Sequence, residues 1–136
     1  MFDGDDPQFA VANAALWRLE RREEPLFTTA QNIAEFWNVL TRPETARGGY
    51  GKLPEVAEHR ISTILLVCEL LTESPSSFAE WRRLMSDFQV LGTSVHDARI
   101  AAIMRVNKIS HILTLDGSGF QRYPFIVAEH PRNTRE

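Results

Sequence analysis

The sequence lacks the features by which several classes of protein are recognised. Its single cysteine, Cys68, excludes a disulfide framework and a cysteine-based zinc site, and fits a reducing compartment. Its four histidines share no metal-ligand spacing. No apolar run approaches the ~18 residues that a membrane span needs, and the acidic start MFDGDDPQFA has neither a basic n-region nor an apolar h-region. These absences predict a cytoplasmic protein that does not enter a membrane.

An excess of positive charge is also absent. The net charge of −3 argues against a protein that coats nucleic acid, although it does not forbid a local basic patch. The 136 residues, of which 43% are hydrophobic and 24% charged, have the composition of an ordinary folded protein. This length is typical of one compact domain, so a single domain over residues 1–136 is expected.

Helical and strand-like patterns alternate along the chain. A helical pattern begins at Asp6 and Pro7, an N-cap followed by a proline at the first helical position. Further helices are predicted for residues 29–43, 54–71, 74–90 and 96–108, and strands for residues 25–29, 110–116 and 124–130, with a short strand also compatible with residues 70–74. This alternation predicts an α/β domain with a mainly parallel sheet.

The start of the chain does not fit this pattern. Parallel α/β domains usually open with a central strand, and this chain opens on a helix. No apolar strand precedes Asp6, so the sheet is expected to lack its first member.

Glu35 raises a second difficulty within the stretch TAQNIAEFWNVLTRP. If this stretch is helical, its neighbours are largely apolar, and no Lys or Arg stands three or four residues away. A lone buried carboxylate is costly. Either Glu35 reaches solvent along a polar seam with Asn32 and Asn38, or it faces a positive group that the sequence does not itself supply.

Three acids stand where predicted strands and helices meet. Glu35 follows the strand at 25–29, Asp97 opens the helix at 96–108, and Asp116 ends the strand at 110–116. Strand ends and helix starts lie on the same edge of a parallel sheet, so these acids are candidates to converge. Clustered carboxylates repel one another unless a cation lies between them, and Mg²⁺ or Mn²⁺ prefers oxygen ligands.

Each acid also has a purely structural interpretation. Asp97 lies near a helix start, where the helix dipole favours an acid. Asp116 precedes Gly117 and fits a turn, and Glu35 fits a solvent-facing seam. Their spacing alone is therefore a weak motif.

The segments AEFWNVLTRP, VHDARIAAIM and HILTLDGSGFQRYPFI, in this order, resemble the PIN-domain family, in particular the VapC-like toxin nucleases of bacterial toxin–antitoxin pairs. The resemblance covers almost all of the chain. It implies a three-layer α/β/α fold and a metal-dependent ribonuclease whose site is a ring of acids. Glu35 matches the family's helix-borne glutamate, Asp97 the aspartate that opens a later helix, and Asp116 the Asp or Asn after a strand ending in Thr.

The chain departs from the family pattern at two places. Gly119 stands where the family commonly has a further acid. The family also opens with a strand ending in Asp-x-Asn, which supplies the first metal ligand, and no such segment is found here. Truncation is therefore expected: either Met1 is an internal methionine about ten residues inside the true frame, an estimate from typical strand length, or the truncation is biological.

The resemblance implies an endoribonuclease toxin in which Glu35, Asp97 and Asp116 hold Mg²⁺ or Mn²⁺. The alternative is a catalytically inactive PIN-fold binding module that pairs with itself or with an antitoxin. The broad apolar surface of the helix at 54–71, together with Trp17, predicts a homodimer or a complex with a small antitoxin.

Overall fold

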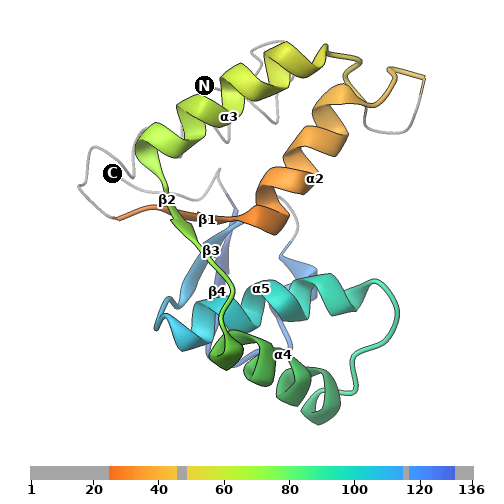
Figure 1. Cartoon of the computed structure of the whole chain (residues 1–136). Helices are drawn as coiled ribbons and strands as arrows, with labels where there is room; N and C mark the ends of the chain where they lie inside the picture. Colours follow the sequence, from red (N-terminus) through yellow and green to blue (C-terminus); the bar gives the residue numbers. More distant parts are fainter. Residues whose placement is uncertain (1–24, 46–48, 115–116, 131–136) are drawn as a thin grey trace.

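The computed structural model describes residues 25–45, 49–114 and 117–130 (Figure 1). Its elements in chain order are β1 (Phe27–Thr29), α2 (Ala30–Thr41), α3 (Pro54–Val67), β2 (Glu69–Leu71), α4 (Pro75–Asp87), α5 (Ser94–Val106), β3 (His111–Leu113), the 3-10 turn η1 (Ser118–Phe120) and β4 (Val127–Glu129). The helix predicted from Asp6 lies outside the described residues, as does Asp116.

The strand-to-helix passage predicted around residue 29 is confirmed. Thr29 ends β1 and is the N-cap of α2: its side chain accepts a hydrogen bond from the backbone N–H of Asn32, at 3.1 Å. The side chain of Asn32 in turn accepts from the backbone N–H of Thr29, at 3.2 Å. This reciprocal capping box satisfies two N–H groups that a helix start leaves unpaired, so α2 begins directly at the end of the strand.

The helix predicted for residues 54–71 is too long. α3 ends at Val67, and residues 69–71 form β2, which overlaps the short strand considered for residues 70–74. The reason is pairing with β1, because the N–H of Glu69 donates to the carbonyl of Leu26 at 2.8 Å. The sequence ILLVCELL is apolar except for Glu69, so its periodicity does not mark where the helix gives way to the strand.

The buried residues of α3 recur at helical spacing along one stripe. They are Ala57, Ile61 and Ile64, with Cys68 following. Leu65 and Leu66 on the other side are exposed. The helix is therefore buried on one side, and apolar side chains on its other side meet solvent.

The strands pair in parallel, as predicted, but in two separate sheets within the described residues. β1 pairs with β2, placing Phe27 opposite Glu69, and β3 pairs with β4, placing His111 opposite Val127. Each sheet contains two strands of three residues. The described part of the chain therefore contains two parallel pairs in place of the one continuous sheet that was expected.

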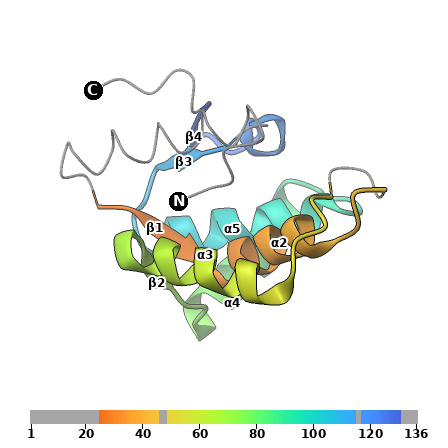
Figure 2. The same ribbon diagram turned by 90° about the horizontal axis from the view of Figure 1, so that it is seen from above.

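The main core lies under α4 and α5, which pack side by side (Figures 1 and 2). α5 is its central element: Ala98, Ala101 and Ala102 are fully buried and small enough to let α4 approach closely. The remaining core members come from α4, from α5 and from the segment between β3 and β4: Leu84, Ile100, Met104, Phe120, Tyr123 and Ile126.

α2 and α3 form a second packed pair beside β1 and β2 (Figure 1). The chain thus has the mixed α/β class that the sequence predicted, with helices and short parallel strands consistent with an α/β/α arrangement. Within the described ranges, no helix has both the length and the apolar content that crossing a membrane requires.

Candidate functional site

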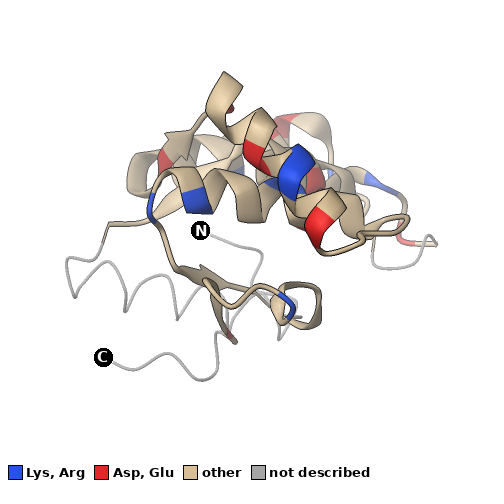
Figure 3. Cartoon of the chain, turned by 90° about the horizontal axis from the view of Figure 1, so that it is seen from below, with Lys and Arg blue, Asp and Glu red and all other residues tan. Residues whose placement is uncertain are grey.

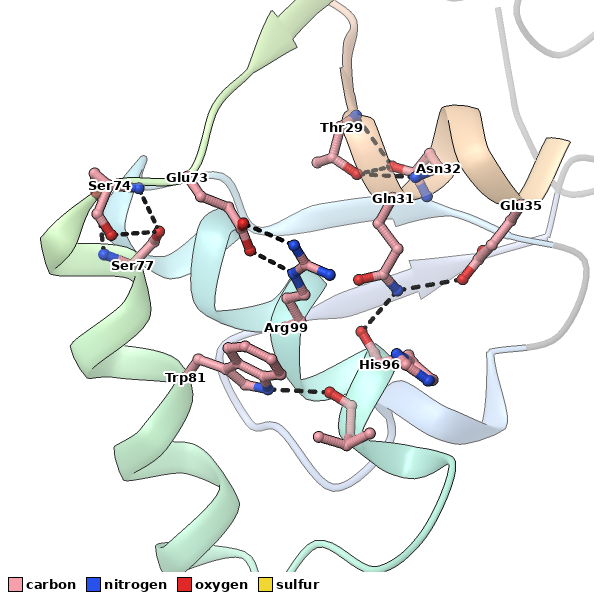
Figure 4. A network of polar contacts seen from close by, with 11 residues as sticks. Thr29, Gln31, Asn32, Glu35, Glu73, Ser74, Ser77, Trp81, His96 and Arg99 are labelled. Atoms are coloured by element: carbon pink, nitrogen blue, oxygen red, sulfur yellow. Dashed lines mark hydrogen bonds and ion pairs between the residues drawn. The ribbon is translucent and has the colours of Figure 1, made fainter. Parts of the chain in front are cut away.

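Helix starts follow strand ends at the edge where the acids were expected to meet. α2 begins directly after β1, and α4 begins after β2 with Ser74 as its N-cap, in a capping box with Ser77. In Figure 4 the start of α2 lies near the first turn of α5, where Gln31 meets His96, and Trp81 of α4 reaches the same turn. The geometry that would gather polar side chains at one edge is therefore present.

Glu35 is exposed, so the difficulty of a buried carboxylate does not arise. Ala34 and Asn38 on the same helix are exposed too, which corresponds to the solvent-facing seam considered from the sequence. A cation is therefore not needed to offset burial at Glu35. An exposed carboxylate remains able to bind one.

Gln31 links Glu35 to the start of α5. Its side-chain amide nitrogen donates to Oε1 of Glu35, four residues later on α2, at 3.2 Å, and to the backbone carbonyl of His96 at 2.9 Å. His96 immediately precedes Asp97 in the first turn of α5. A single side chain thus joins the helix that carries one candidate acid to the turn that carries another (Figure 4).

Asp97 lies in the first turn of α5, half-buried against η1. A Cβ atom built on Gly119 would lie 2.0 Å from Oδ2 of Asp97 and 2.9 Å from its Cγ. The family position that commonly holds an acid is therefore filled, in this chain, by the carboxylate of Asp97. A side chain at residue 119 would have to displace it.

The charge of Asp97 affects the pKa of Tyr123. Burial raises the pKa of the Tyr123 phenol, Arg122 lowers it, and the negative charge of Asp97 raises it further. The ring is almost completely buried and packs edge-on against Phe88, with ring centroids 5.0 Å apart. The charge of Asp97 thus acts on a phenol that is held in place by aromatic packing.

The first turn of α5 is also held from α4. The indole N–H of Trp81 donates to the carbonyl of Val95 at 3.0 Å. Arg99 lies over the Trp81 ring, 5.4 Å from its centroid, and forms a two-pronged ion pair with Glu73 in which Nη2 and Oε2 are 2.7 Å apart. The hydrogen bond from Arg99 lowers the pKa of Glu73. The start of α5 is consequently fixed from α2, from α4 and from η1.

Of the three predicted site residues, the structure thus places Glu35 and Asp97 on neighbouring elements. Asp116 lies outside the described residues, and within those residues no three His, Cys, Asp or Glu side chains are grouped to hold a metal. The acids at this edge, Glu35 and Asp97, offer carboxylate oxygens, which suit a hard divalent cation. The chemistry of the donor set therefore fits Mg²⁺ or Mn²⁺.

Gln31 is the residue that the sequence interpretation missed. Its signal was its position four residues before Glu35, since side chains at that spacing meet on a helix surface. Its second partner, the His96 carbonyl, is 65 positions away and follows only from the tertiary fold.

Comparison with known proteins identifies the family of the chain. No curated protein matches the chain. The family model described as PIN domain matches residues 4–126, which is most of the chain. The match includes all the described elements up to the start of β4, and with them Glu35, Asp97 and Asp116. The chain belongs to the PIN domain family.

Proposed function

We propose that this protein is a metal-dependent endoribonuclease and the toxin of a toxin–antitoxin pair. PIN domains are generally nuclease domains and typically use divalent metal ions. The observation that carries the proposal is the Gln31 link, which ties Glu35 to the helix start that bears Asp97. The toxin role rests on the sequence resemblance to VapC-like nucleases.

In this proposal Glu35, Asp97 and Asp116 hold Mg²⁺ or Mn²⁺ at the strand-end edge. When bound, the cation lowers the pKa of a water molecule and neutralises charge on the scissile phosphate. Glu35 and Asp97 orient the ion from α2 and α5, and no protein nucleophile is required. Asp97 stands in the first turn of α5, where the helix dipole favours a negative charge.

A further ligand is proposed to come from a strand outside the described residues. The two parallel pairs, β1–β2 and β3–β4, share no described strand, which is the arrangement expected if a central strand joins them. In the related family that strand ends in Asp-x-Asn, which would add an acid at the same edge as Glu35 and Asp97.

The proposed substrate is RNA. Acidic and basic positions are interspersed on the described helices in the view of Figure 3, in keeping with the net charge of −3. RNA binding is therefore expected to depend on local contacts and on the cation at the site. RNA that cannot reach the strand-end edge should bind more weakly.

The proposed partners are a second copy of the chain and a small antitoxin. Leu53 at the start of α3 is 61% exposed, and Leu66 near its end is 85% exposed. Leu65 and Leu70 are each 45% exposed, so apolar side chains gather where α3 leads into β2. Exposed apolar clusters commonly mark interaction surfaces. We place the protein in the cytoplasm, where RNA and a partner are both available.

The same exposed leucines favour a second candidate function. The chain would then be a catalytically inactive PIN-fold module whose role is pairing with itself or with an antitoxin. This alternative requires the leucine surface and does not require the acids. Substitution of the acids therefore separates the two functions.

The deciding experiment is calorimetric titration of the purified protein with Mn²⁺. Asp97→Asn and Glu35→Gln should each weaken binding about tenfold or more, by at least the loss typical of a supporting group. Asp87→Asn, which changes an exposed acid on α4, is the matched control and should leave Mn²⁺ affinity unchanged. Unchanged affinity in both site variants would remove the metal-dependent function and leave the binding module.

A further inference from the structure

Gln31 occupies the second position of α2 and makes two hydrogen bonds with one nitrogen. The amide N–H₂ group donates to a carboxylate oxygen of Glu35 and to the His96 carbonyl, which are both acceptors only. These two bonds use both of its protons.

The other half of the same amide is left without a partner. Oε1 of Gln31 is buried and has no hydrogen-bond partner within the part of the chain that the structure describes. Rotating the amide by half a turn would set this oxygen against two acceptor oxygens and would forfeit both existing bonds. The orientation is therefore fixed by Glu35 and His96, and a buried unpaired acceptor calls for an explanation.

The bridge restricts a side chain that would otherwise be mobile. Glu35 is exposed and has no Lys or Arg three or four residues away, so nothing else on α2 directs its long side chain. The bond from Gln31 draws its carboxylate toward the first turn of α5. Asp97, next to His96, is set in turn by its contact with Gly119.

We infer that Gln31 is a positioning residue of the candidate metal centre, one that sets the Glu35 carboxylate against the turn bearing Asp97. The inference rests on the proposed function and adds a residue to it. Gln31 acts through Glu35, whose carboxylate its amide nitrogen holds by a hydrogen bond.

The test is Mn²⁺ affinity of the whole chain, measured by calorimetry and by electron paramagnetic resonance of free Mn²⁺. Gln31→Leu keeps the approximate size of the side chain and removes both hydrogen bonds. It should weaken Mn²⁺ binding about tenfold, at the lower end of the effect typical of groups that orient ligands. Asn38→Leu, which removes an exposed amide from the same helix, should leave the affinity unchanged.

A double-mutant cycle tests whether Gln31 affects Mn²⁺ affinity through Glu35. If Gln31 acts through Glu35, Gln31→Leu should cost much less Mn²⁺ affinity in a Glu35→Gln background than in the unaltered chain. An equal loss in both backgrounds would overturn the inference, because Gln31 would then act on the fold as a whole. Unchanged affinity in Gln31→Leu, with Asp97→Asn still weakening binding, would overturn the inference and leave the proposed function intact.

A metal-free measurement keeps the inference testable if Gln31→Leu fails to fold. The side-chain amide signals of Gln31 in nitrogen-15 nuclear magnetic resonance should shift on Glu35→Gln in the chain with Gln31 intact. Insensitive signals would show that the bridge does not form in solution and would overturn the inference. If the unaltered chain binds no Mn²⁺ at all, the proposed function fails, and the positioning role falls with it.

Discussion

Gly119 and Asp97 fit together so closely that the glycine has no room for a side chain: a Cβ atom would lie 2.0 Å from Oδ2 of the aspartate. The contact joins η1 to the first turn of α5. The carboxylate of Asp97 occupies the volume that an acid at residue 119 would need.

Gly119→Ala should therefore destabilise the protein by about 1 kcal/mol, the lower end of the usual cost of overpacking, because the atoms that must move are the end of the Asp97 side chain. The measurement is urea unfolding followed by circular dichroism. In an Asp97→Ala background the same substitution should cost little, since only the Asp97 Cβ, at an ordinary contact of 3.6 Å, remains nearby. Equal costs in the two backgrounds would show that the contact does not determine the effect.

The Glu73–Arg99 ion pair predicts an acid-sensitive contribution to stability. The pKa of Glu73 is lowered from 4.5, mainly by the Arg99 hydrogen bond, so the contribution is present above the unfolded pKa and is lost as pH falls through the folded pKa. Because the pair is largely exposed, Glu73→Gln should cost only about 0.2–1 kcal/mol at pH 7, and less in high salt.

The stability difference between Glu73→Gln and the unaltered chain should vanish in thermal melts performed well below pH 4.5. Glu58→Gln, at an exposed position on α3, provides the control and should show no such pH-dependent difference. A deficit in Glu73→Gln that persists at low pH would mean that Glu73 acts through packing.

The exposed leucines of α3 predict a measurable interaction. Leu66→Glu places a charge in the most exposed of these positions and should weaken homodimer formation, since burying an unpaired carboxylate in an interface is unfavourable. Light scattering over a range of concentrations is the measurement, and Ser86→Glu on α4 is the charge control. If the unaltered chain stays monomeric at high concentration and binds no antitoxin, the exposed leucines of α3 are not an interaction surface.

The sequence predicted the elements better than it predicted their ends and contacts. Capping residues such as Thr29 and Ser74 are local signals, and both helices begin where these residues indicate. The end of α3 was wrong, because pairing with β1 is a tertiary event that the apolar run around Cys68 does not record. Glu35 was expected among apolar neighbours, yet adjacency in sequence does not decide which helix face meets solvent.

The same limit applies to the candidate site. Strand ends and helix starts share one edge of a parallel sheet, and this rule predicted that Glu35 and Asp97 lie at that edge. The structure puts them on neighbouring elements linked by Gln31. The link itself depends on the approach of α2 to α5, which no local pattern encodes. Asp116 lies outside the described residues, so its place in the site stays a prediction.

The pairing of the strands has a consequence for motion. Backbone hydrogen bonds hold β1 to β2 and β3 to β4, whereas side-chain bonds such as those from Gln31 to His96 and from Arg99 to Glu73 connect the helices across the pairs. Exposed polar bonds of this kind break more readily than a packed core. The distance between Glu35 and Asp97 is thus governed by the weakest bonds at that edge. A ligand that contacts both acids would stabilise the arrangement in which α2 and α5 meet, so its binding energy would also hold these two helices together.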